Sequence, residues 1–106
     1  MEKNIRISEL CDVYGDLLTA RQKEIVKSYY DYDLSLAEIS ENYGITRQAV
    51  RDAIVKASEL LENYEKVVGT LAYKTSVTDL ITEVSALLDD GCVEKAKETL
   101  LRISKN

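Results

Sequence analysis

The stretch LSLAEISENYGITRQAVRDAI, residues 34–54, decides the fold of this 106-residue chain. Ser35 and Glu38 have the spacing of a capping box, in which a hydroxyl and a carboxylate each bond a free amide at the start of a helix. The helix that follows spans barely two turns, because Gly44 can adopt the left-handed conformation that ends it. Thr46 can cap another helix two residues later. The stretch therefore predicts two helices joined by a glycine turn.

The apolar residues of this stretch have the spacing of a helix-turn-helix, in which two helices cross closely and share one core. Ser40 is small where the helices approach each other, and Ile45 fills the corner of the turn. Ile39, Val50 and Ala53 are spaced to meet beneath the turn. Short capped helices joined by glycine also occur in other small helical proteins, so the spacing alone leaves that plainer interpretation open.

Helical periodicity extends over the rest of the chain, which has no proline and only four glycines. An apolar stripe predicts a helix over about residues 4–18, in which Cys11 belongs to the core. Thr19 and Gln22 form a second capping box that begins the next helix. That helix is expected to end at residues 31–33, where short polar side chains compete for backbone hydrogen bonds.

The helix that begins after Thr46 is predicted to continue to about residue 68. Its apolar residues alternate in steps of four and three, a heptad pattern that needs a partner surface. They are Val50, Ile54, Ala57, Leu61, Tyr64 and Val68. Gly69 and the polar residues 74–76 are expected to interrupt the pattern. Two further helices, separated by residues 89–91, are predicted to follow and to form a hairpin. The stripe of the last helix is Val93, Ala96, Leu100 and Ile103.

We therefore predict an all-α protein of six helices in two parts. Residues 1–68 form a helix-turn-helix domain, and residues 69–106 form a C-terminal helical hairpin that docks or dimerises and is too small to be independent. The heptad pattern and the two tail stripes offer more apolar surface than one chain readily covers, which predicts a homodimer. The alternative is a hairpin that folds back on the heptad stripe of its own chain.

Composition argues against several classes of function. No apolar stretch approaches the ~20 residues that span a bilayer, and the charged start, MEKNIRISEL, lacks the apolar core of a secretory signal. We expect a cytoplasmic protein with no membrane partner. The chain has no histidine, the commonest general base and zinc ligand, and its two cysteines fit no motif. No catalytic, metal or cofactor site is predicted, so enzymatic activity is not expected.

Residues 34–54 resemble the DNA-binding helix-turn-helix of sigma factor region 4, and the resemblance implies that the helix-turn-helix domain is a sigma-region-4-like bundle. A longer segment, YGDLLTARQKEIVKSYYDYDLSLAEISENYGITRQAVRDAI at residues 14–54, followed by LLENYE at residues 60–65, resembles the YlxM family of helix-turn-helix proteins associated with the signal recognition particle. The resemblance continues more weakly through the acidic, leucine-rich tail. It implies a noncatalytic regulator of the signal recognition particle pathway, whose partner is DNA or the RNA or protein of that particle.

The resemblance also implies which residues contact nucleic acid. Thr46 caps the recognition helix, and Arg47, Gln48 and Arg51 face outward from its first turns, where groove contacts are usually made. Arginine can pair bidentately with guanine, and glutamine with adenine. Ser35 and the first amides of its helix can hold a phosphate. An ordinary solvated helix face is the alternative interpretation of each residue.

Charge argues against tight binding to bulk DNA. Residues 19–68 contain seven basic and nine acidic side chains, whereas nonspecific affinity comes from neutralised phosphates. Asp52 is expected to repel phosphate unless it pairs with Lys56 one turn later. Two rival functions therefore stay open, namely a sequence-specific DNA-binding transcription regulator and a protein interaction module that binds no nucleic acid.

Overall fold

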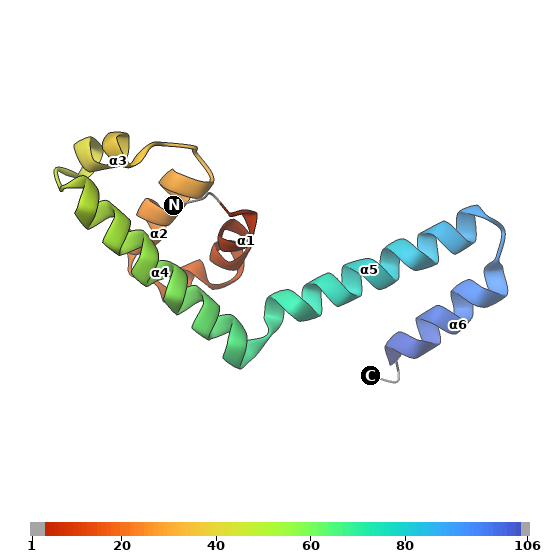
Figure 1. Cartoon of the computed structure of the whole chain (residues 1–106). Helices are drawn as coiled ribbons and strands as arrows, with labels where there is room; N and C mark the ends of the chain where they lie inside the picture. Colours follow the sequence, from red (N-terminus) through yellow and green to blue (C-terminus); the bar gives the residue numbers. More distant parts are fainter. Residues whose placement is uncertain (1–3, 105–106) are drawn as a thin grey trace. The chain divides into compact units, whose positions relative to one another are not determined.

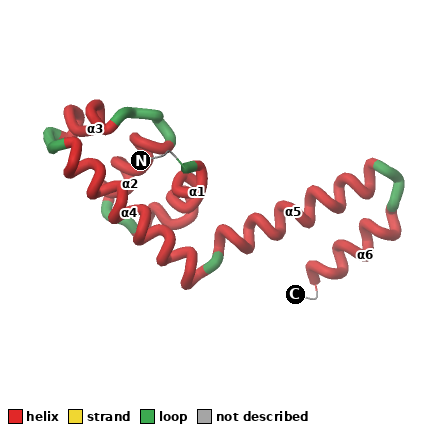
Figure 2. The backbone as a smooth tube through the Cα atoms, in the orientation of Figure 1, coloured by secondary structure: helices red, strands yellow, loops and turns green. Residues whose placement is uncertain are grey.

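The computed structural model describes residues 4–104, which contain six α-helices, one 3-10 helix and no strand (Figures 1 and 2). The elements are α1 (Ile5–Tyr14), η1 (Gly15–Leu17), α2 (Ala20–Tyr30), α3 (Leu36–Tyr43), α4 (Arg47–Val68), α5 (Thr70–Asp89) and α6 (Val93–Ser104). The predicted all-α class with six helices is confirmed. The chain divides into two compact units, Met1–Gly69 and Thr70–Asn106. None of the helices within the described range is long and apolar enough to cross a bilayer.

The helix α1 is shorter than its apolar pattern predicted. It ends at Tyr14 rather than near residue 18, and the chain tightens into η1. The residue that follows α1 is a glycine, a weak helix former, and Asp16 beside it accepts a hydrogen bond from Lys23 Nζ of α2 at 2.6 Å. Leu17, which belongs to the apolar pattern of residues 4–18, lies in η1 and is exposed.

Side-chain caps begin α2 and α3 at the predicted residues. Thr19 Oγ1 accepts a hydrogen bond from the Gln22 amide at 3.1 Å, and the Gln22 side chain accepts one from the Thr19 amide at 3.0 Å. Ser35 and Glu38 form the same reciprocal pair. Gly44 then ends α3 with φ 64° and ψ 34°, in the left-handed region. Both predicted capping boxes and the glycine turn are confirmed.

The helix α4 contacts α1, α2 and α3 (Figure 1), and one stripe of it is buried in the first unit. Its fully buried residues, termed the α4 seam, are Val50, Ile54, Ala57 and Leu61. The first half of the seam packs with Ile25 and Tyr29 of α2 and Ile39 of α3 in one apolar cluster. Ala53 lies against the same cluster, so the predicted core beneath the helix-turn-helix is confirmed.

The α4 seam is covered by helices of its own chain, which corrects the expectation that the stripe remains open for a partner. The helix α1 contacts α4, and side-chain hydrogen bonds from two of its residues fix it there. Arg6 Nε donates to Glu62 Oε1 at 2.7 Å, and the Tyr14 hydroxyl donates to Glu65 Oε1 at 2.6 Å. The stripe also ends early, since Val68 is exposed. The homodimer stays a prediction, but the seam cannot supply its interface.

The second unit is a hairpin in which α6 returns alongside α5 (Figure 1). The chain turns at Gly91, whose φ is 78°. The helix α5 runs unbroken through residues 74–76, where an interruption was expected. Those three residues are exposed, so their polar side chains stay in water and the helix loses no packing by including them.

The buried side of α6 differs from the predicted stripe. Ala96 is buried as expected, but Thr99 replaces Leu100 as the next buried residue. The Thr99 hydroxyl donates to the Lys95 carbonyl oxygen at 3.0 Å, so its burial leaves no polar atom unsatisfied. Val93 and Leu100, both expected in the core, are exposed. The side chain of Ile103 lies outside the described residues.

Replacing Gly44 by valine is expected to destabilise the first unit by about 1–2 kcal/mol, the usual cost of left-handed backbone in a residue with a Cβ. Crowding is not the cause, because a Cβ at Gly44 would meet nothing within 4 Å. Gly44→Asn is the matched control, since asparagine tolerates this conformation. Urea unfolding followed by circular dichroism should give a lower midpoint for valine than for asparagine. Equal midpoints would contradict the observed turn.

Candidate nucleic-acid interface

The start of α4 positions most of the predicted contact residues. Thr46 precedes the helix with extended backbone, and its Oγ1 accepts a hydrogen bond from the Ala49 amide at 3.0 Å. The buried Val50 fixes the rotation of the helix about its axis. The residues that consequently project into solvent from the first two turns, termed the α4 face, are Arg47, Gln48 and Arg51.

Both arginines of the α4 face are available to a ligand. Within residues 4–104, neither guanidinium forms an ion pair with a carboxylate. By contrast, Arg6 and Arg102 are each bound to a glutamate, and Arg21 lies 5.4 Å from the centroid of the Tyr43 ring. The helix dipole adds partial positive charge at the same end of α4. Among the described residues, the arginines without a side-chain partner both lie on the α4 face.

Gln48 is oriented by an acidic neighbour. Its Nε2 donates a hydrogen bond to Asp52 Oδ1 at 2.8 Å. The partner considered from the sequence, Lys56, forms no ion pair within the described part of the chain. The bond leaves the carbonyl oxygen and the second amide hydrogen of Gln48 for a ligand. Asp52 is itself exposed, so its carboxylate borders the α4 face and opposes phosphate there.

Ser35 lies apart from this face in the sequence, at the start of α3. Its hydroxyl oxygen accepts from the Glu38 amide at 3.1 Å, and its own amide donates to Glu38 Oε1 at 3.2 Å. A phosphate at this helix end must compete with the Glu38 carboxylate. The observed role of Ser35 is therefore helix capping, and phosphate contact at Ser35 stays a prediction.

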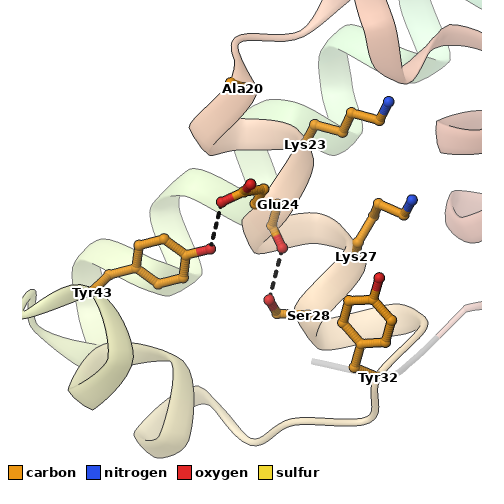
Figure 3. Close-up of a pocket in the computed structure, with 7 residues that line it drawn as sticks. All are labelled: Ala20, Lys23, Glu24, Lys27, Ser28, Tyr32 and Tyr43. Atoms are coloured by element: carbon orange, nitrogen blue, oxygen red, sulfur yellow. Dashed lines mark hydrogen bonds between the residues drawn. The ribbon is translucent and has the colours of Figure 1, made fainter.

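A hollow along α2 was not predicted from the sequence (Figure 3). Its volume is about 390 Å³, and its lining consists of Ala20, Lys23, Glu24, Lys27, Ser28, Tyr32 and Tyr43. The available signal was the i,i+4 spacing of the two lysines, which places them on one side of a helix. Contact with Tyr43, which comes from α3, depends on tertiary packing that the sequence does not display.

The charges around this hollow cancel. Lys23 Nζ is bound to Asp16 Oδ1 at 2.6 Å, and Glu24 accepts a hydrogen bond from the Tyr43 hydroxyl at 3.2 Å. The hydrogen bond with Lys23 lowers the pKa of Asp16 and raises that of Lys23, so both groups stay charged at neutral pH. Two carboxylates thus offset the two lysines, and the hollow lacks the positive field that an anion requires. The α4 face is the better candidate site.

The titratable groups elsewhere do not form a reactive cluster in the described residues. No group of cysteine, aspartate and glutamate side chains within residues 4–104 could hold a metal ion. Cys11 is buried, as predicted. Burial, followed by the nearby negative charge of Asp31, raises the pKa of its thiol. The thiol therefore stays protonated and packs as an apolar side chain.

Comparison with known proteins gives a family match over most of the chain. Residues 1–101 match the UPF0122 family, described as "Putative helix-turn-helix protein, YlxM / p13 like". A UPF0122 protein of Desulforamulus reducens is 43% identical over 89 residues, which cover 84% of this chain and 76% of that relative. A UPF0122 protein of Clostridium kluyveri is 38% identical over 103 residues, covering 97% and 93% of the two chains. A UPF0122 protein of Shouchella clausii is 36% identical over 106 residues, which cover 99% of this chain and 97% of that relative.

Removal of the cap at the start of α4 should weaken the scaffold beneath the α4 face. Thr46→Ala is expected to cost about 1 kcal/mol of unfolding free energy, because the Ala49 amide loses its acceptor. Thr46→Ser is the control, since serine offers the same oxygen. Urea unfolding of both variants measures the difference. Equal urea midpoints for the alanine and serine variants would show that the Thr46 cap does not stabilise the protein.

Proposed function

Because this chain belongs to the UPF0122 family of YlxM/p13-like helix-turn-helix proteins, we propose that it is a noncatalytic regulator that binds nucleic acid through the α4 face. The observation that carries the proposal is the pair of exposed arginines without carboxylate partners, Arg47 and Arg51. A helix-turn-helix inserts the first turns of its second helix into the major groove of duplex DNA. In that groove arginine can pair with guanine, and Gln48 with adenine.

We further propose that the protein acts in the cytoplasm, in the signal recognition particle pathway. The support is the resemblance of residues 14–54 and 60–65 to the YlxM family. The RNA of the particle is the second nucleic acid to consider. It would meet the α4 face differently from DNA, because the major groove of A-form RNA is too narrow for side chains. Contact would then involve loops, bulges and phosphates.

The net charge of −5 favours a selective ligand over general coating of nucleic acid, which depends on many neutralised phosphates. The acidic part of α4 also favours a second candidate function. Glu59 is exposed and Glu62 is partly exposed beyond the α4 face, so this length of the helix suits a protein partner better than a phosphate backbone. An interaction module without nucleic acid is therefore the alternative.

The predicted homodimer belongs to the same proposal. Helix-turn-helix regulators commonly bind as dimers, so that two recognition helices reach two half-sites related by two-fold symmetry. The support in this chain is the exposure of several large apolar side chains on the hairpin of α5 and α6. Two copies joined there would each contribute one α4 face.

Replacing both arginines of the α4 face by alanine should reduce nucleic-acid affinity without loss of stability, because both side chains are exposed. The expected loss is about 1–3 kcal/mol for each base contact, and the salt slope should fall by about one for each phosphate contact. Wild type and Arg47→Ala/Arg51→Ala would be titrated against duplex DNA and against signal recognition particle RNA at two salt concentrations.

The control for this titration is Lys66→Ala/Lys95→Ala, which removes the same charge from exposed positions outside the α4 face. It should bind nearly as wild type does. Equal binding by wild type and the arginine variant would exclude the α4 face as the site. If wild type binds neither nucleic acid, the nucleic-acid proposal fails and the interaction module is left.

Replacing Asp52 by asparagine is expected to strengthen nucleic-acid binding severalfold at about 0.15 M salt, because the variant removes a carboxylate beside the α4 face. Asparagine keeps an acceptor for the Gln48 hydrogen bond. Glu59→Gln removes the same charge about 10 Å further along the helix, where salt screens its effect on the groove. An equal gain in both variants would show that net charge alone acts, and that Asp52 does not face the ligand.

A further inference from the structure

The hairpin of α5 and α6 leaves large apolar side chains in water. The exposed fractions of Ile81 and Leu88 on α5 are 57% and 52%, and those of Val93 and Leu100 on α6 are 46% and 51%. The contact between the two helices instead buries Val84 and two smaller side chains, Ala96 and Thr99. The hairpin therefore covers only part of the apolar surface that its sequence provides.

The four exposed residues share one side of the hairpin. Ile81 precedes the buried Val84 by three residues, and Leu88 follows it by four. On α6, Val93 precedes the buried Ala96 by three residues, and Leu100 follows it by four. Because the two helices run antiparallel (Figure 1), equal offsets from the line of contact place residues of both helices on the same side. This side, termed the hairpin face, consists of Ile81, Leu88, Val93 and Leu100.

The opposite side of the hairpin is polar. Arg102 of α6 donates from its Nη2 to Glu83 Oε1 of α5 at 3.1 Å, and to Thr99 Oγ1 at 3.2 Å. Glu83 directly precedes Val84 in the chain, so it projects about 100° away around the helix, opposite in sense to Leu88. The ion pair closes the hairpin on this side. The hairpin is thus amphipathic as a unit, with water-compatible groups on one side and the hairpin face on the other.

We propose that the hairpin is one half of a four-helix bundle, completed by the hairpin of a second copy of this chain. In such bundles each helix buries a stripe of about three residues in seven, wider than the line that one neighbour covers. Here α5 and α6 each bury one part of that stripe against the other helix. The remaining part is the hairpin face, which is the same on every copy and so suits a two-fold interface.

The apolar area of the hairpin face is adequate for this role. Each of its four side chains exposes roughly 100 Å², so two copies together remove roughly 800 Å² from water. Val77, seven residues before Val84, is partly exposed near the same side, and with the polar atoms at the edge it brings the total toward the ~1,000 Å² of the smallest specific interfaces. The unit Thr70–Asn106 is also shorter than the ~40 residues below which chains usually need help to fold. Burial against a second copy supplies that help.

A second copy fits the hairpin face better than the first unit of the same chain does. The exposed large apolar residues of the first unit are dispersed over α1, η1, the segment after α2, and α4. Among the residues of this unit that the structure describes, only Val67 and Val68 are adjacent in sequence, and two valines offer less apolar surface than the four side chains of the hairpin face. Charge does not oppose self-association either, because residues 70–106 contain five basic and six acidic side chains. This inference rests on the dimer of the proposed function and names its interface, but its test needs no nucleic acid and can fail or succeed independently of nucleic-acid binding.

The test is the molar mass of the full chain in solution at micromolar concentration, measured by light scattering and by sedimentation. Wild type should have twice the 12.0 kDa mass of one chain. Leu100→Glu and Leu88→Glu should each have the mass of one chain, because a buried glutamate opposes the apolar interface. Leu101→Glu is the matched control. Leu101 is as exposed as Leu100, at 58%, but lies one position around the helix from the hairpin face, so its variant should stay dimeric.

A milder pair of variants separates loss of the interface from loss of the hairpin. Leu100→Ser removes apolar surface without adding charge, and its dimer should dissociate roughly tenfold or more readily than that of Leu101→Ser. Far-UV circular dichroism at high protein concentration should show equal helix content for the two. Wild type with the mass of one chain would overturn the proposal. Equal dissociation constants for the two serine variants would overturn the assignment of the hairpin face.

Discussion

Burial of the α4 seam is the interaction on which the rest of the first unit depends. Val50 and Ile54 complete the core of the helix-turn-helix, while the later part of α4 is fixed to α1 by the hydrogen bonds of Glu62 and Glu65. The same packing sets the direction of the α4 face. A rotation of α4 by one residue, about 100°, would carry its arginines toward the core. Their exposure is thus a consequence of apolar packing behind them.

Local features of the fold followed from the sequence because their partners are close in the chain. The reciprocal bonds of Thr19 with Gln22 need only three residues of helix, and the left-handed Gly44 needs only its own backbone. The cover of the α4 seam could not be predicted, because heptad spacing fits a helix of the same chain or of another equally well. In α6, periodicity correctly placed Ala96 in the buried stripe but did not show that Thr99, rather than Leu100, would be the next buried residue.

The sequence predicted the exposure of the candidate site residues but not all of their contacts. Once Val50 is assigned to the core, helical geometry places Arg47 and Arg51 outside it, and the structure has both exposed. The bond of Asp52 with Gln48 was not foreseen, since Lys56 lies equally far along the helix and side-chain rotamers decide between the two. The roles of these side chains toward a ligand depend on chemistry outside the chain, which no pattern within it specifies.

The contacts between α1 and the end of α4 also set an order of events during synthesis. Chains emerge from the ribosome N-terminus first, at about 5–20 residues per second. The hydroxyl of Tyr14 can donate to Glu65 only after 51 more residues have been added to the chain. At those rates this takes about 3–10 s. The turn at Gly44, by contrast, can form as soon as its neighbours emerge. The helix α1 is synthesised first, but it can make its contacts with the end of α4 only when nearly the whole first unit has been made. The core of this unit therefore closes late in synthesis.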